Sequence, residues 1–355
     1  ATNQNLNRDY LKLDQPEMRA VRGLILKYQP DLYVDVHVTD GMDYQYDVTY
    51  GFNGENGTFS RSPASSRWLD QVFKPAMNAA LERQGHIPGE LVFGVDDNDP
   101  KKGLSDGGLG ERFSNGWGAA AHVPTILIEN HSLKPHEQRV LGTYVFMEEA
   151  MRLLASHGGD LRAATQSDLA LRPAEIPANF EAEDQPSSTR DFKGILYETY
   201  DSPASGRREI RWLGRADPET WRMPFYGSKP TLTLKRPTAY WVPSYRTDII
   251  ERLKIHGVEM ETLAAPRTVN LSMLLVAATH LQGVEGTDTI AGSTATMDRV
   301  LRFAVLHSGV SRDEALLTAA ATPTPAASDT APTPTTSPTP SSTWPGCRSR
   351  PTCSR

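Results

Sequence analysis

An aspartate and a histidine near residue 35 are the side chains best placed to do chemistry in this chain. Val34, Val36 and Val38 alternate with Asp35 and His37, and this alternation predicts a β-strand. Because side chains alternate between the two faces of a strand, Asp35 and His37 share the face opposite the valines. Imidazole is the commonest metal ligand in proteins, so we interpret His37 as a candidate ligand. The alternative is a histidine that is hydrogen-bonded within the core.

Two further groups could act beside such a histidine. Asn7-Arg8 lies in a polar opening segment, and Glu129 ends the apolar run that starts at Pro124. A guanidinium group binds a carboxylate through two parallel hydrogen bonds, and a carboxylate at the end of a buried strand can act as a general base. As alternatives, Asn7-Arg8 is a capped loop with an exposed ion pair, and Glu129 caps the next segment or bonds to His131 on the same face.

The order of these groups resembles the M14 family of zinc carboxypeptidases, especially its bacterial members, over roughly residues 3–155. The resemblance implies an α/β fold with a mixed sheet flanked by helices, and one Zn²⁺ ion bound by His37. It also implies that Asn7 and Arg8 bind the free C-terminus of a peptide substrate and that Glu129 is the general base. Asp35 would support the metal ligand as its hydrogen-bond partner. We further expect an extracellular or periplasmic location.

One part of the family pattern is missing from this chain. The family takes two zinc ligands from a His-x-x-Glu motif upstream of the Asn-Arg pair, and only six residues precede Asn7. The chain's own His-x-x-Glu, His256 to Glu259, follows Glu129 and is interpreted as a chance match. Zinc sites use three or four protein ligands. The chain is therefore predicted to be the inactive C-terminal portion of a longer enzyme, with an exposed sheet edge and a bare apolar face.

Two other functions remain open at this stage. A zinc-dependent amide deacylase could use the same groups on an acyl-amino acid. A non-catalytic module could instead hold a peptide or a glycan without metal. Arg112 could contribute positive charge to an oxyanion, or it could be a surface arginine. The aromatic residues that could shape a side-chain pocket are Tyr44, Tyr46, Tyr50 and Trp117.

Hydrophobic periodicity predicts how these groups are positioned. Helices are expected after Asp14, from about Ser66 to Gly85, and from Pro135 onward. In the last of these, a stripe of Val140, Tyr144, Met147, Met151 and Leu154 is expected to pack on the sheet. Strands are expected at 91–95, 124–131, 195–200, 209–213, 231–235 and 239–242.

Composition divides the chain into five parts. Residues 1–159 are assigned to the catalytic domain, 160–190 to a linker, and 191–266 to a small β-rich appendage. Residues 267–318 are left unassigned, because the strand-like alternation of apolar and polar residues fades there. A divergent stalk and a shifted reading frame in the gene would both produce this loss. Residues 319–355 are rich in Ala, Thr, Pro and Ser, which predicts a disordered tail.

Charge and hydropathy exclude two classes of partner. The net charge is -6, and Lys and Arg are scattered, so no basic surface for nucleic acid is expected. No run of eighteen apolar residues is present, so no membrane span is expected. The two cysteines, Cys347 and Cys353, lie at the end of the chain and cannot cross-link the core.

Overall fold

The computed structural model describes residues 5–39, 41–55, 61–106, 110–265, 268, 281–283 and 290–293. Two short strands, β13 (Leu281–Gly283) and β14 (Ile290–Ser293), pair with each other. The rest of the uncertain region 267–318, and the predicted tail 319–355, lie outside the described residues. The expectations for those two regions therefore stay predictions.

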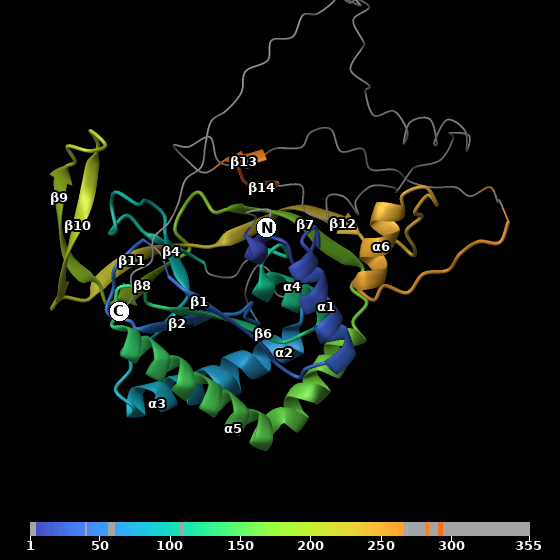
Figure 1. Ribbon diagram of the computed structural model, residues 1–355, viewed down its shortest axis with the longest axis horizontal. Coiled ribbons are helices and arrows are strands. Elements are labelled where there is room, and N and C mark those ends of the chain that lie inside the picture. The colour runs from blue at the N-terminus through green and yellow to red at the C-terminus, as the bar shows by residue number, and fades with distance from the viewer. Residues whose placement is uncertain are drawn as a thin grey trace, which may run out of the picture. The chain divides into compact units, whose positions relative to one another are not determined.

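A four-stranded mixed sheet lies at the centre of the fold (Figure 1). Its order is β1 (Tyr33–Val38), β6 (Thr125–Asn130), β2 (Val48–Gly51) and β3 (Pro88–Glu90). β1 and β6 are parallel, whereas β2 runs antiparallel to β6. The predicted α/β class with a mixed sheet is confirmed.

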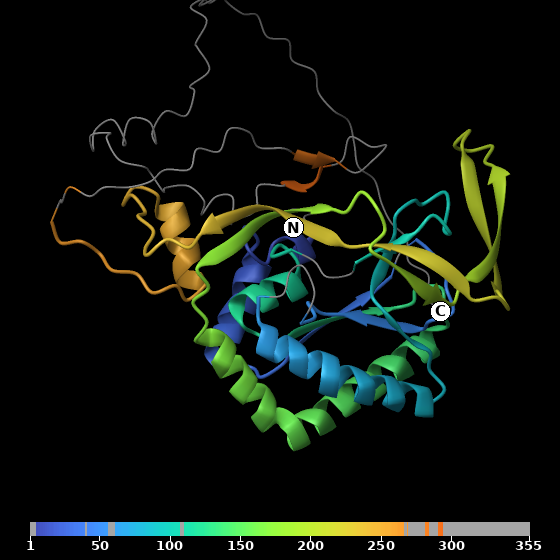
Figure 2. The ribbon, with the colours of Figure 1, turned by 180° about the vertical axis from the view of Figure 1, so that it is seen from behind.

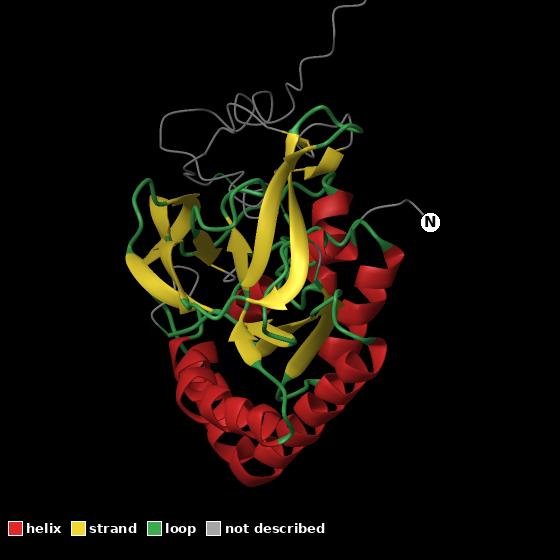
Figure 3. Ribbon diagram, turned by 90° about the vertical axis from the view of Figure 1, so that its left-hand side faces the viewer, coloured by secondary structure: helices red, strands yellow, loops and turns green. Residues whose placement is uncertain are grey.

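One face of this sheet is covered by helices, which Figures 1 and 3 show beneath the strands. These helices are α2 (Pro63–Trp68), α3 (Lys74–Arg83) and α5 (His136–Leu169). A π-helical turn, Leu69–Phe73, joins α2 to α3 just before Pro75, where the missing proline N–H interrupts the helical hydrogen bonds. The core beneath the sheet includes Ile126 and Ile128 of β6, with Phe73 and Phe146 from the helices.

The predicted packing stripe of α5 is wrong apart from Leu154, which packs against the core beneath the sheet. Val140, Tyr144 and Met151 are 51%, 64% and 63% exposed. The face that meets the sheet is instead formed by Gly142, Phe146, Ala150 and Leu153. This helix carries two apolar stripes, and hydrophobic periodicity cannot tell which one the sheet covers.

The C-terminal half of α5 lies close to the start of β1. Arg162 of this helix makes the connection. Its guanidinium group forms an ion pair of 2.6 Å with Asp31, just before β1. On β1 itself, Val36 and Val38 are 47% and 52% exposed. Among the described residues β1 pairs with β6 alone, so its outer edge is open beside this apolar surface. The expected open edge is present among the described residues, and two exposed valines lie on it.

A second four-stranded sheet crosses the predicted domain boundary. It contains β4 (Val92–Gly94), β5 (Leu104–Asp106), β11 (Trp221–Tyr226) and β8 (Ser188–Phe192). The first two strands come from the predicted catalytic part and the last two from the linker and appendage. The appendage is therefore joined to the catalytic part by backbone hydrogen bonds.

The linker predicted at 160–190 is also wrong, because α5 continues to Leu169 and two strands follow it. β7 (Glu175–Ala182) pairs with β12 (Ser228–Lys235), and β9 (Ile195–Asp201) pairs with β10 (Arg208–Ala216). Figure 2 shows both two-stranded ribbons. No strand forms at 239–242, which is described throughout. Polar, proline-bearing composition favoured a linker, but exposed ribbons share that composition.

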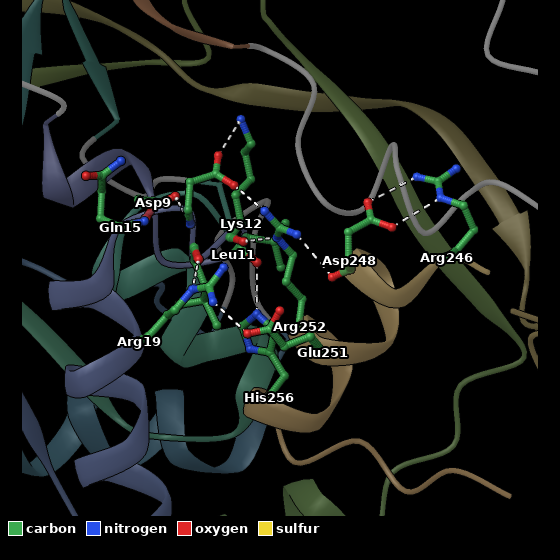
Figure 4. Close-up of polar contacts among 12 residues, drawn as sticks. Asp9, Leu11, Lys12, Gln15, Arg19, Arg246, Asp248, Glu251, Arg252 and His256 are labelled. Atoms are coloured by element: carbon green, nitrogen blue, oxygen red, sulfur yellow. Dashed lines mark hydrogen bonds and ion pairs between the residues drawn. The ribbon is translucent and has the colours of Figure 1, made fainter. Parts of the chain in front are cut away.

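The opposite face of the central sheet meets α1 (Pro16–Tyr28) and α4 (Ser114–Ala121), whose side chains pack around Tyr10 and Trp117 near Tyr33. α6 (Thr247–Ile255) docks on this group (Figure 4). Arg252 binds Asp14 at 2.6 Å, and His256 contacts the Leu11 carbonyl oxygen at 2.8 Å. Among the described helices, none combines the length and apolarity needed to cross a bilayer.

Candidate functional site

Parallel pairing of β1 and β6 brings His37 beside Glu129. The two residues are register partners, as are Asp35 and Leu127 one step earlier along the strands. Register partners in a sheet project from the same face, and Val34, Ile126 and Ile128 occupy the opposite, helix-covered face. Residues 92 positions apart in the chain therefore share one face of the sheet at the carboxyl ends of both strands.

The imidazole ring of His37 is oriented by Asp35. The Asp35 Oδ2 atom lies 2.8 Å from His37 Nε2, and the Tyr10 hydroxyl donates to the same oxygen at 3.5 Å. Asn7 Nδ2 lies 3.3 Å from Nε2. Because a carboxylate can only accept, the shorter contact assigns the Nε2 proton to the bond with Asp35. The Nδ1 lone pair is then available to a metal ion or a proton. This is the arrangement expected when Asp35 orients a metal-binding histidine through its other ring nitrogen.

Asn7 joins the opening segment to this pair. It lies in a short 3-10 turn, Leu6–Arg8, and is 9% exposed. Its Oδ1 atom accepts a hydrogen bond of 2.9 Å from the Ser114 backbone N–H at the start of α4. The Asn7 side chain therefore caps a helix with one end and faces His37 with the other. Asn7 is positioned to organise the site from within.

Arg8 lies at the edge of the same group. Its Nη1 donates to the Asn7 carbonyl oxygen at 2.9 Å, and its guanidinium carbon lies 4.3 Å from the centre of the Phe113 ring. The charge of Arg8 opposes protonation of His37, which places the guanidinium group within electrostatic reach of the imidazole. All four residues predicted for the site, Asn7, Arg8, His37 and Glu129, are thus brought together.

His37 has a raised pKa, chiefly because its ring bonds to Asp35; burial acts in the opposite direction, and the charges of Asp35 and Glu129 raise the pKa further. A raised pKa in the folded state stabilises the fold fully below the unfolded pKa of about 6.5. That stabilisation is lost as the pH rises through the folded value.

We expect an NMR titration of metal-free protein to show a His37 midpoint above the value for a free imidazole. Substitution of Asp35 by Asn should lower this midpoint by about one unit or more, because the charge is lost while the shape is kept. The signal of His157, exposed on α5, is the internal control for effects of the substitution elsewhere. An unchanged His37 midpoint in the Asp35→Asn variant would remove Asp35 as the cause.

The alternative of a bond between Glu129 and His131 is not observed. His131 is 1% exposed, and its ring faces Asp43 at 3.0 Å and the backbone N–H groups of Tyr44 and Leu133. The alternation of residues 129 and 131 is present, but His131 comes after β6 ends at Asn130. His131 therefore belongs to the loop around Asp43.

The aromatic residues predicted to line a pocket lie in hydrophobic cores instead. Tyr44, Tyr50 and Trp117 are 7%, 4% and 3% exposed. Tyr44 and Tyr46 pack around Phe192 of β8, and Tyr50 lies in β2 against Phe146. The loop-like composition of residues 40–66 concealed a short central strand, β2. The prediction of an aromatic pocket is wrong for these residues.

Tyr10 was not predicted as a site residue, although it lies two positions after Arg8. Its hydroxyl bonds to the hydroxyl of Tyr33 at 2.8 Å and also contacts Asp35. Local sequence gives no signal for this contact, because Tyr10 and Asp35 are 25 positions apart.

A metal site is incomplete in the described part of the chain. No group of three or more His, Cys, Asp or Glu side chains suited to a metal ion is found there. His256, of the chance His-x-x-Glu match, bonds to Leu11 and packs near Trp117. The residues present offer His37 as an oriented ligand, but they do not by themselves fit a zinc ion.

A small cavity lies away from these residues, next to α2 and α4. Its volume is about 10 Å³, and residues such as Ser62, Ser66 and Thr125 line it. This volume is enough for about one water molecule. The cavity is therefore no rival to the His37 group as a ligand site.

Comparison with known proteins finds no matching family, curated protein or solved structure.

Proposed function

We propose that this chain supplies the general base, the substrate clamp and one metal ligand of a zinc-dependent metallocarboxypeptidase with the corresponding α/β fold. The observation that supports this best is the pairing of His37 with Glu129, with Asn7 in contact with the imidazole. A hydrogen-bonded core histidine explains Asp35 alone. It does not explain why an acid, an amide and a guanidinium group converge at the same place.

Each side chain has a role that its surroundings favour. Arg8 would bind the free carboxylate of a peptide and so confine cleavage to the last bond. Glu129 would accept a proton from the attacking water and pass it to the leaving amine. His37 would hold zinc through Nδ1. The ion, when bound, supplies Lewis acidity that polarises the scissile carbonyl group and acidifies water.

The remaining zinc ligands must come from residues outside the described part of the chain. Glu129 occupies the β6 side of His37, so the approach left open is across the unpaired edge of β1. On the opposite face of that edge, the exposed Val36 and Val38 offer apolar surface for the polypeptide that carries these ligands.

The substrate clamp can be tested without catalysis. We expect the chain to bind hippuryl-phenylalanine about tenfold more tightly than the same compound with a C-terminal amide, measured by calorimetry at low salt. Arg8→Gln should abolish this difference. Arg83→Gln is the matched control, because Arg83 is exposed at the end of α3. Equal binding of acid and amide by the unsubstituted chain would contradict the proposal.

The metal site is tested by zinc content after dialysis and by hydrolysis of the same peptide. The chain alone is expected to retain little zinc and to be inactive, and His37→Ala should remove any weak binding that remains. Stoichiometric, chelator-sensitive zinc together with peptide hydrolysis would show that the ligand set is already complete.

Two other functions use the same groups. A zinc-dependent deacylase would release the acyl group of a blocked amino acid faster than it releases the last residue of a peptide, so a comparison of these two reactions separates the enzymes. A non-catalytic module for a peptide or a glycan is favoured by the incomplete ligand set in the described chain. An upstream sequence without His-x-x-Glu would support that module.

A further inference from the structure

The outer edge of β1 presents a regular row of backbone groups. The Tyr33 N–H donates to the Pro124 carbonyl oxygen at 2.8 Å, and the Thr39 N–H donates to the Asn130 carbonyl oxygen at 2.8 Å. Both acceptors lie on the β6 side. Because backbone groups alternate in direction along a strand, the odd-numbered residues bond toward β6 and the even-numbered residues face outward. The outward-facing N–H and C=O groups therefore belong to Val34, Val36 and Val38.

This edge lacks features that often protect a sheet from pairing with another strand. The register of β1 with β6 runs over residues 33–38 without a bulge, and the segment contains neither proline nor lysine. Among the described residues, no strand pairs with the outer side of β1. The side chains of Val36 and Val38 are 47% and 52% exposed, so a second strand can reach the backbone and the apolar side chains together.

An antiparallel pair of β1 strands is complementary to itself when it is centred on Val36. Outward-facing residues then meet each other, with Val36 opposite Val36 and Val34 opposite Val38 of the second copy. On the other face each Asp35 lies opposite a His37, which pairs a carboxylate with an imidazole twice. Centring the pair on Asp35 would place two carboxylates opposite each other, and centring it on His37 would oppose two imidazoles. Charge therefore selects the register centred on Val36.

We propose that two copies of this chain form a symmetric dimer through their β1 edges, antiparallel and centred on Val36. The two four-stranded central sheets then join into one continuous sheet through about six new backbone hydrogen bonds. A two-fold axis closes the assembly, because each copy covers the open edge of the other. The dimer occupies the edge that the proposed function leaves to the ligand-carrying polypeptide. It is therefore the state of the chain without that polypeptide, and it requires neither metal nor substrate.

The dimer is tested by sedimentation equilibrium of the 355-residue chain. The paired segment is short, so we expect a reversible dimer with a dissociation constant of roughly 10–100 μM. Val38→Lys should weaken dimerisation at least about tenfold, because a lysine on an edge strand opposes pairing. Val140→Lys is the matched control, since Val140 is 51% exposed on α5, and it should leave the dissociation constant unchanged. Thermal unfolding of each variant confirms that the chain remains folded.

The register is tested by cross-linking in a chain whose Cys347 and Cys353 are replaced by Ser. Val36→Cys should form a disulfide-linked dimer on oxidation, because paired Cα atoms about 5.5 Å apart suit a disulfide. Val38→Cys should not, because its partner position is Val34 of the second copy.

Three results would overturn the proposal. A chain that stays monomeric well above the expected dissociation constant has no such dimer. A dimer that Val140→Lys breaks and Val38→Lys leaves intact forms through α5 instead. Efficient cross-linking of Val38→Cys, with none of Val36→Cys, would place the two strands in a different register.

Discussion

Replacing Phe146 by Ala is expected to lower the free energy of unfolding by about 3–5 kcal/mol, the usual cost of emptying a buried phenylalanine site. Phe146 is fully buried in α5, and its ring lies 5.3 Å from that of Tyr50 and 5.7 Å from that of Phe73. The substitution removes contacts between α5, β2 and the helix pair α2–α3 at once. Against a typical total of about 5–15 kcal/mol, this loss is large.

Tyr144→Ala is the matched control for that variant. Tyr144 is two positions away on the same helix and 64% exposed, so its loss should cost less than about 0.5 kcal/mol. Urea unfolding followed by circular dichroism measures both variants. Equal losses would mean that the stripe predicted from the sequence also packs on the sheet.

Replacing Asp168 by Ala is expected to lower the free energy of unfolding by about 3 kcal/mol, because several buried donors lose their acceptor together. Asp168 lies in the last turn of α5 and is 1% exposed. Its carboxylate accepts from the Ala64 N–H at 2.9 Å, and from the N–H and hydroxyl of Ser65 at 2.8 and 2.6 Å. The side chain of Ser62 makes no capping bond to α2, so Asp168 caps that helix from a distance.

Asp160→Ala is the control for that position. Asp160 is on the same helix, its side chain is 77% exposed, and its contact with His157 is a surface pair of 3.6 Å. Such pairs contribute little, so the expected loss is under about 0.5 kcal/mol. A small effect of Asp168→Ala, with the helix content unchanged, would show that water replaces the carboxylate at the start of α2.

Phe146 and Asp168, the residues with the two largest expected effects, both lie in α5 and support the site from below the sheet. α5 holds the helix-covered face of the sheet through Phe146 and holds α2 through Asp168, while Asp35, His37 and Glu129 project from the other face. The core side of the sheet therefore fixes the strands, and the strands fix the spacing of the reacting groups. Stability variants of α5 are expected to leave the contact between Asp35 and His37 intact as long as the protein is folded.

Local sequence determined the elements whose pattern is strong. Alternation of valines with Asp35 and His37 predicted β1 and the shared face of the two polar side chains. The apolar run ending at Glu129 predicted β6, and the three- to four-residue spacing of apolar side chains predicted α1 and α5. These predictions use only the direction of side chains within one helix or strand, and residues adjacent in the sequence determine that direction.

Only the tertiary structure decided which faces and segments meet. Periodicity gave α5 two apolar stripes, and the position of the sheet chose the one with Phe146. Composition made residues 160–190 a linker, whereas α5 continues to Leu169 and the strands β7 and β8 pair with distant strands. The register of β1 with β6 joined His37 to Glu129, and bonds between segments 7–10 and 112–114 joined the opening segment to the start of α4. These contacts join residues far apart in the chain, so no local pattern carries them.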